Sequence, residues 1–333
     1  MQVSVLIVTR NEEIYILECI KSIEGQFLDN TKWELIIVDG ISTDNTVKLA
    51  VEYLQEYASY PYQVLTNEEK ILATGWNIGI KAAKGKYIIR PDAHAILYPG
   101  YIQEGIKTLE EKPEVGAVGG TLKTLSKGFR GNLIKIALSS KVGVGDSSFR
   151  VGAKSGYKDT VVYGLYRKEV FEDVGFFNEF LQKHQDTEFH ARVLQKSWKF
   201  WLNGNMKAGY YCRDSVKKLA KQMYKIGLHI PDLIKGKYVI GIQTRHLMPF
   251  FFFSTMIGNL ILGFAFQVFF YLALIQLILY LVVLTGFAII NIFAQKKFSF
   301  KYLLLVPIIF TMHFFYFFGT FTGFLKKTRH NRT

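Results

Sequence analysis

Two aspartates stand just past the ends of apolar runs that predict β-strands. Asp39 follows the run 35–38, and Asp92 comes shortly after the run 87–89. In α/β sheets, ligands bind beyond the carboxyl ends of the strands. Carboxylates there would repel a diphosphate unless a divalent cation lies between them. The pattern therefore predicts a metal-assisted site for a phosphorylated ligand at this edge.

The elements that must position these acids alternate between strand and helix. Hydrophobic periodicity predicts strands over 3–9, 35–38, 62–66 and 87–89, with helices over 14–23, 44–57 and 75–83 between them. This alternation predicts an α/β fold with a mostly parallel, Rossmann-like sheet and helices on both faces. Asp44 is the expected N-cap of the second helix.

A dinucleotide-binding Rossmann domain is the obvious alternative for this part. It fails on the residues, because Arg-Asn-Glu-Glu follows the first strand where a Gly-x-Gly-x-x-Gly turn would be needed. The basic residues are scattered among acids and form no recognised nucleic-acid motif, so no nucleic-acid partner is expected. Cys19 and Cys212 are too far apart to predict a disulfide framework or a zinc site.

The last part of the chain has a different composition. All 27 acidic residues lie between Glu12 and Asp232, and the segments 247–295 and 302–325 contain no formal charge. A membrane-spanning helix needs about 20 apolar residues. The first segment is long enough for two such helices and the second for one. Neither has an ionisable residue pair in its interior, which argues against a transporter or a channel.

The composition divides the chain into four parts. We expect a catalytic domain over 1–213, a basic amphipathic juxtamembrane segment over 214–246, a membrane region over 247–325 and a basic tail over 326–333. Lysines opposite an apolar helix face favour contact with anionic membrane lipids. Because the amino terminus shows no secretory signal pattern, we expect the catalytic domain in the cytoplasm and the chain in the cytoplasmic membrane, crossing it more than once.

Five segments of residues 1–246, taken in order and spacing, resemble family 2 glycosyltransferases of the GT-A fold. They are Thr9–Glu13, Val38–Thr46, Pro91–His94, Gly164–Glu179 and Gln185–Val193. The sequences Gly143–Arg150, Asp159–Gly164 and Arg245–Pro249 are similar to those of membrane-anchored glucosyltransferases of succinoglycan and related exopolysaccharide synthesis.

The resemblance implies roles for individual residues. The donor nucleotide sugar, a UDP-sugar by preference, would be bound by residues near the strand ends and by one glutamine of the juxtamembrane helix: Thr9, Asn11, Glu12, Asp39, Asp44, Asp92 and Gln222. The metal-binding motif falls on Asp92 and His94, where most relatives have a second aspartate. Imidazole suits Mn²⁺ better than Mg²⁺, which prefers oxygen, and either ion is a possible cofactor.

The catalytic base implied by the resemblance is Asp186. Inverting transfer needs one carboxylate to accept the proton of the attacking hydroxyl. Glu188 is a rival, but two helical positions away it points about 200° from Asp186. Arg167 and Lys168 would open a helix beside the acceptor.

The resulting expectation is an inverting, metal-dependent enzyme that transfers a sugar to a polyprenyl-diphosphate-linked saccharide in exopolysaccharide or capsule synthesis. Two alternatives stay open: a transferase that makes a polyprenyl-phosphate sugar, and a non-catalytic scaffold of the same fold. The segment 302–325 is expected to span the membrane or to enter it without crossing, since Pro307 can break a helix.

Overall fold

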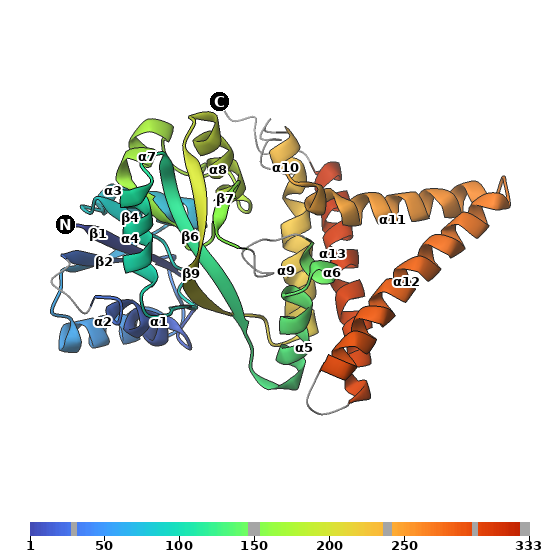
Figure 1. Cartoon of the computed structure of the whole chain (residues 1–333), viewed down its shortest axis with the longest axis horizontal. Coiled ribbons are helices and arrows are strands. Elements are labelled where there is room, and N and C mark those ends of the chain that lie inside the picture. Colours follow the sequence, from blue (N-terminus) through green and yellow to red (C-terminus); the bar gives the residue numbers. More distant parts are fainter. Residues whose placement is uncertain (28–31, 146–153, 236–241, 295–298, 327–333) are drawn as a thin grey trace. The chain divides into compact units, whose positions relative to one another are not determined.

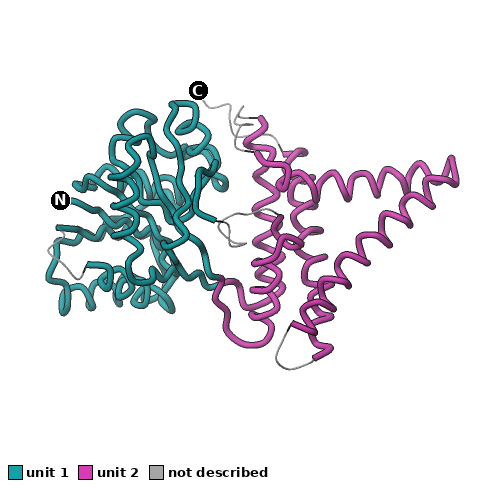
Figure 2. Tube along the Cα trace, in the orientation of Figure 1, with its two compact units in different colours: residues 1–123, 148–211 teal, residues 124–147, 212–333 magenta. Residues whose placement is uncertain are grey.

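The computed structural model of the chain describes residues 1–27, 32–145, 154–235, 242–294 and 299–326. These residues form two compact units (Figure 2): residues 1–123 with 148–211, and residues 124–147 with 212–333. The second unit therefore takes in residues 124–147, which composition does not separate from the first part of the chain. Each unit is described by itself.

The first unit is built on one mixed β-sheet with the strand order β3-β2-β1-β4-β8-β6-β9-β5, with β7 paired to β9. The strands are β1 (Val3–Thr9), β2 (Trp33–Asp39), β3 (Tyr62–Thr66), β4 (Tyr87–Ile89), β5 (Ala95–Leu97), β6 (Val115–Leu125), β7 (Gly156–Lys158), β8 (Leu165–Arg167) and β9 (Lys199–Tyr211). Strands β1 to β4 are parallel, as the alternation of strands and helices predicts. From β8 onward the pairing is antiparallel.

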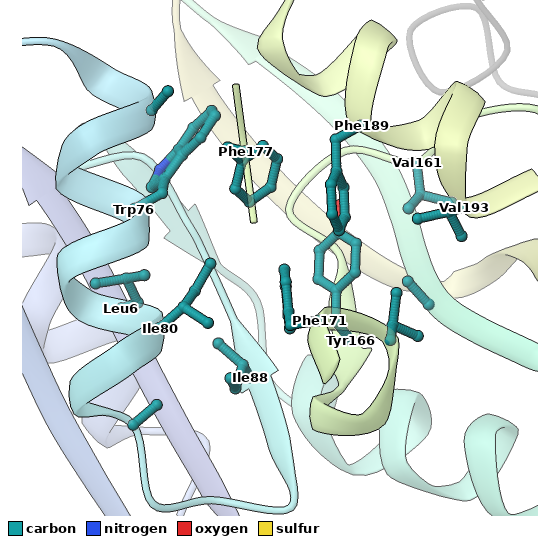
Figure 3. Close-up of a cluster of buried hydrophobic side chains, with 14 of the residues drawn as sticks. Leu6, Trp76, Ile80, Ile88, Val161, Tyr166, Phe171, Phe177, Phe189 and Val193 are labelled. Carbon is teal, nitrogen blue, oxygen red and sulfur yellow. The ribbon is translucent and has the colours of Figure 1, made fainter. Parts of the chain in front are cut away.

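The helices of the first unit are α1 (Ile16–Glu24), α2 (Thr46–Tyr57), α3 (Leu72–Ala82), α4 (Tyr101–Glu111), α7 (Lys168–Val174) and α8 (Gln185–Gln195). Figure 3 shows the core that α3, α7 and α8 share on the sheet, with Trp76, Phe177 and Phe189 at its centre. Close approach of α3 to β1 needs a glycine at 79, because a Cβ there would lie 2.0 Å from Leu6 Cδ1. This packing fixes where the carboxyl ends of β1, β2 and β4 lie.

The described part of the second unit contains helices and, from β6, the end of one strand. Its helices are α5 (Gly128–Leu138), α6 (Lys141–Val144), α9 (Val216–Leu228), α10 (Ile230–Lys235), α11 (Thr244–Gly263), α12 (Val268–Ala294), the 3-10 helix η2 (Phe300–Leu304) and α13 (Leu305–Leu325). Within this unit α13 runs beside α9, while α11 and α12 form a hairpin that extends away from them (Figure 1).

Among the residues that the structure describes, three helical segments are long and apolar enough to cross a membrane: Thr244–Gly263, Val268–Ala294 and Phe300–Leu325. They agree in position with the uncharged segments of the sequence. At about 1.5 Å per residue, the 20 residues of α11 extend over roughly 30 Å, the thickness of a bilayer core. Pro249 lies in the second turn of α11, where the helix continues past it.

Candidate active site

Asp92 and His94 lie just beyond the carboxyl end of β4. A parallel bridge between Val8 and Asp92 places the aspartate beside the end of β1. Asp92 Oδ2 and His94 Nε2 are 4.0 Å apart, and their side chains are 40% and 18% exposed. Both groups therefore face each other at a position that a ligand can reach.

Two neighbours orient this pair. Glu12 Oε1 lies 3.2 Å from His94 Nδ1, and the Tyr163 hydroxyl donates to Asp92 Oδ2 at 3.2 Å. Because a carboxylate accepts hydrogen bonds, the Glu12 contact favours the proton on Nδ1 and leaves Nε2 as an acceptor toward Asp92. Two acceptors 4.0 Å apart are suited to a divalent cation between them. Among the described residues, no group of three or more His, Cys, Asp or Glu side chains is placed to hold an ion.

Asp39, at the end of β2, is engaged by its own turn. Its Oδ2 accepts from the Ser42 amide at 2.8 Å and its Oδ1 from the Ser42 hydroxyl at 2.5 Å. Asn11 joins the same turn, since its amide donates to Ser42 Oγ and its Oδ1 accepts from the Thr43 amide. The structure thus brings Asn11 and Asp39, predicted donor-binding residues, onto adjoining loops.

Asp44 shapes the start of α2, although the helix begins at Thr46 and its N-cap is Asn45. The prediction that Asp44 is the N-cap is thus wrong by one position. The Asp44 side chain nevertheless accepts hydrogen bonds from Thr46, the first residue of the helix. Its Oδ1 accepts from the Thr46 amide at 3.0 Å and from the Thr46 hydroxyl at 2.5 Å. Burial opposes the charge of Asp44, but these hydrogen bonds prevail and lower its pKa.

Asp186 lies in the first turn of α8 with a side chain that is 47% exposed. Its Oδ1 accepts from Arg90 Nη2 at 2.5 Å. The guanidinium, in contrast, is only 4% exposed. Burial disfavours the charge of Arg90, but the carboxylate of Asp186 and the hydroxyl of Tyr166 outweigh it and raise the pKa of Arg90 above its usual value. A permanent cation therefore lies behind a solvent-accessible carboxylate.

Glu188 occupies a different environment on the same helix. Its side chain is 2% exposed, and its two oxygens accept from Nε and Nη2 of Arg192 at 2.6 and 3.0 Å. Arg192 also donates to the carbonyls of Val174 and Phe176. Both oxygens of Glu188 thus hold Arg192, which joins α8 to the last residue of α7 and to the segment that follows it.

Other predicted residues have structural contacts or lie elsewhere. Thr9 is buried at the end of β1, and Gln222 belongs to the second unit, on α9. Arg167 donates to the backbone carbonyl of Val115, and Lys168 to that of Ala83, so both bind their own chain. Most of the sequence Gly143–Arg150, together with Lys296, Lys297 and residues 327–333, lies outside the described residues.

Sequence reasoning missed Arg90 and Tyr163. Arg90 is a charged residue at the end of an apolar strand run, directly before Pro91-Asp92, and that position alone signals a buried ion pair. Tyr163 gives no such signal, because only the folded loop brings its hydroxyl to Asp92.

A mixed sheet whose parallel strands β1 to β4 end at this acid-lined edge agrees with the GT-A type of domain that the sequence predicts. The family model described as glycosyl transferase family 2 matches residues 4–175. A relative from Methanococcus voltae, dolichyl N-acetyl-alpha-D-glucosaminyl phosphate 3-beta-D-2,3-diacetamido-2,3-dideoxy-beta-D-glucuronosyltransferase, is 30% identical over 78% of this chain and 82% of its own. The chain therefore belongs to glycosyl transferase family 2, and it is a glycosyltransferase.

Further similarity agrees with this family. Succinoglycan biosynthesis protein ExoA from Rhizobium meliloti (strain 1021) is 26% identical over 65% of this chain and 64% of its own. Among solved structures, the mannosyltransferase PcManGT from Pyrobaculum calidifontis has a TM-score of 0.61 at 16% identity, covering 97% of this chain and 87% of that chain. Residues 1–349 of S. aureus TarS have a TM-score of 0.53 at 19% identity, covering 98% and 92%. The GT-A fold expected from the sequence is thus confirmed.

Proposed function

We propose that this glycosyltransferase moves a sugar, with inversion, from a nucleotide-diphosphate sugar to a polyprenyl-linked saccharide at a membrane surface. The observation that carries the proposal is the arrangement within the first unit: two facing metal-ligand groups, Asp92 and His94, and an exposed carboxylate, Asp186, tied by Arg90 to the same strand end. A UDP-sugar is the preferred donor.

Asp92 and His94 are the residues that would hold the metal. When bound, a divalent ion neutralises the charge that grows on the departing diphosphate. The imidazole makes Mn²⁺ the preferred ion over Mg²⁺. Mn²⁺ is named with the bound nucleotide sugar in the structure of PcManGT, which supports a divalent metal here. Glu12 would keep His94 in the tautomer that a metal ligand requires.

Asp186 is the proposed base. The acceptor hydroxyl loses its proton to the Asp186 carboxylate as its oxygen attacks the anomeric carbon, and the bond from that carbon to the diphosphate breaks. The exposure of Asp186 supports this role. Burial and the bidentate contact with Arg192 argue against Glu188, since both of its oxygens are bonded to a guanidinium and shielded from an acceptor.

The acceptor class rests on the relatives and on the apolar helices. The name of the Methanococcus voltae relative specifies a sugar on dolichyl phosphate as its acceptor, and ExoA is named for succinoglycan biosynthesis. Helical segments long enough to cross a bilayer, such as α11 and α12, would keep an enzyme beside such a lipid. Tethering both partners to one surface raises the effective concentration of the acceptor. Elongation of a lipid-linked glycan, as in exopolysaccharide synthesis, is the resulting proposal.

The membrane arrangement is part of the proposal. Helices α9 and α13 approach so closely that a Cβ on Gly319 would lie 2.1 Å from the carbonyl oxygen of Tyr224. Helix α9 exposes Lys217, Lys218, Lys221 and Lys225. Ammonium groups are costly at the centre of a bilayer, so α9 belongs at its surface. A helix packed along α9 shares that depth, and we therefore assign membrane crossing to α11 and α12 and place α13 at the cytoplasmic surface.

A reporter fused after Thr333 tests this arrangement. A crossing hairpin with α13 at the surface leaves the fusion in the cytoplasm, together with the basic residues that favour that side. An extracytoplasmic signal would mean that all three segments cross.

The activity itself is tested by incubating membranes that contain the full chain with a panel of radiolabelled nucleotide sugars. Each donor is supplied with polyprenyl phosphate, with a polyprenyl-phosphate sugar or with a polyprenyl-diphosphate sugar. We expect label in lipid only with a sugar-bearing acceptor. Label on polyprenyl phosphate itself would overturn the acceptor assignment and favour synthesis of a lipid-phosphate sugar.

A further inference from the structure

A chain of hydrogen bonds between buried polar groups lies behind the proposed base. Arg90 Nη2 donates both to Asp186 Oδ1 at 2.5 Å and to the hydroxyl of Tyr166 at 3.1 Å. Arg90 and Tyr166 are both buried. The exposed carboxylate is thus anchored to the interior of the first unit.

Aromatic side chains fix the orientation of Arg90. The guanidinium carbon lies 4.0 Å from the ring centre of Trp76, 4.7 Å from that of Phe177 and 5.3 Å from that of Tyr166. Figure 3 shows these three rings around the centre of the core, between α3 and α8. A guanidinium between rings can turn little, and it gains cation–π attraction there. The packing therefore fixes the direction in which Nη2 donates, toward Asp186 and the hydroxyl of Tyr166.

Assigning one donor and one acceptor to each bond extends this hydrogen-bond chain beyond Tyr166. The Tyr166 hydroxyl accepts from Arg90, so its single proton is left to donate to His190 Nε2, 2.7 Å away. His190 then carries its proton on Nδ1, which donates to Thr160 Oγ1 at 2.7 Å. Burial lowers the pKa of His190 to about 4, so the ring is neutral near pH 7, as this pattern requires.

The hydrogen-bond chain ends in the loop that also contacts Asp92. Thr160 stands three residues before Tyr163, whose hydroxyl donates to Asp92 Oδ2. Tyr163 has a φ of 47°, a left-handed conformation that is costly for a non-glycine residue and persists only where the surroundings hold it. The loop 160–163 is thus hydrogen-bonded to Asp92 at one end. At its other end it is bonded to the hydrogen-bond chain that leads to Asp186.

We infer that Arg90, Tyr166 and His190 form a positioning relay. Through their hydrogen bonds they fix the position of the Asp186 carboxylate relative to that of Asp92. The relay rests on the proposed role of Asp186. It holds Oδ1, so the proton from the acceptor hydroxyl goes to Oδ2. None of the three residues touches substrate; each acts through Asp186 or through the loop 160–163.

Tyr166→Phe in the full-length protein tests the relay, because it removes the hydroxyl and keeps the ring that packs on Arg90 and Phe189. We expect kcat to fall about tenfold, the scale of one lost hydrogen bond, with the KM for the donor unchanged within about twofold. In an Asp186→Asn background, Tyr166→Phe is expected to have no further effect on the residual kcat, since the relay acts only through that carboxylate.

Tyr60→Phe is the matched control. The Tyr60 hydroxyl likewise donates to a side chain, in this case Glu24 Oε1 at 2.5 Å, in the same unit but outside the relay. This variant reports the cost of losing such a bond without touching Asp186, and we expect its kcat to match that of the wild type.

Four results would overturn the relay. One is an equal loss of kcat from Tyr166→Phe in the wild-type and Asp186→Asn backgrounds. Another is a change confined to the melting temperature or to the donor KM. Full activity of Asp186→Asn alone is the third, and it would refute the proposed base together with the relay. An inactive Asp186→Asn variant with an unaffected Tyr166→Phe variant refutes the relay and leaves the base standing.

Discussion

The carboxylates of the first unit fall into two regions that use their charge differently. Around the carboxyl end of β2, Asp39 and Asp44 accept their shortest hydrogen bonds from residues two or three positions away in the chain, and Asp44 Oδ2 also accepts from the Glu13 amide at 3.3 Å. Beyond β4 and at the start of α8, Asp92 and Asp186 are 40% and 47% exposed and are held by residues 71 and 96 positions distant.

The difference in hydrogen-bond partners distinguishes carboxylates that stabilise a turn from carboxylates that can take part in a reaction. A carboxylate whose oxygens are used by its own turn stabilises that turn. A carboxylate held from behind by a distant, buried partner keeps an oxygen for a ligand. Altering the first kind should lower stability and weaken the predicted binding of the donor, whereas altering the second kind should lower kcat.

Removing the metal should give the largest effect. Chelation with EDTA is expected to abolish transfer, and Mn²⁺ should restore it at least as well as Mg²⁺. Asp92→Asn should lower kcat by about 10³-fold at saturating donor, because a metal contributes several kcal/mol to stabilising the transition state. Initial rates over a metal titration measure both effects. Full activity in EDTA would remove Asp92 and His94 from the chemistry.

Asp186→Asn should come next, with a loss of kcat of roughly 10²-fold or more, the usual contribution of a general base. Donor binding should be largely kept, because the shape of the side chain is preserved. Glu188→Gln is the companion variant. If it lost kcat comparably while Asp186→Asn did not, the base would have been placed on the wrong residue of α8.

His190 makes the support of Asp186 sensitive to acid. Its folded pKa of about 4 lies below the ordinary value of 6.5, so the unfolded chain binds more protons between these values. The free energy of unfolding should therefore fall by about 3 kcal/mol as the pH drops from about 6.5 to about 4. Thermal melts over this pH range measure the fall, and in His190→Gln this component should be missing. An unchanged pH dependence in the variant would contradict the assignment.

Glu12→Gln tests a second long-range contact, from Glu12 to His94. The variant keeps a hydrogen-bonding side chain but loses the charge that favours the proton on Nδ1. We expect the Mn²⁺ concentration for half-maximal rate to rise about tenfold or more, the usual scale for a residue that orients a metal ligand. The maximal rate at saturating Mn²⁺ should change much less. An unchanged metal requirement would show that Glu12 does not act through His94.

Asp44→Ala should show the smallest effect, on stability. Loss of the hydrogen bonds to Thr46 at the start of α2 is expected to lower the free energy of unfolding by about 1 kcal/mol. Chemical denaturation of the detergent-solubilised protein measures this change. A destabilisation as large as that expected for His190 at acid pH would erase the distinction between the two regions.

Much of the fold follows from the sequence alone. Apolar runs of strand length, separated by amphipathic helical segments, fix the parallel strands β1 to β4, and the uncharged segments fix the helices α11, α12 and α13. Asp92 stands out in the sequence because it follows a strand, and the resemblance to family 2 glycosyltransferases predicts that His94 shares its metal-binding motif. Signals of this kind involve only residues that are close in the chain, so they can be recognised in the sequence.

The tertiary structure decided the roles that depend on distant partners. Asp186 and Glu188 both stand in the first turn of one helix, and only packing buries Glu188 against Arg192 and opens Asp186 to solvent. The antiparallel half of the sheet, the glycine-mediated packing of α13 on α9, and the contacts of Arg90 and Tyr163 likewise join residues far apart in the chain. The sequence determines which groups can ionise or bind a metal. Burial and long-range hydrogen bonding decide which of them stay available for chemistry.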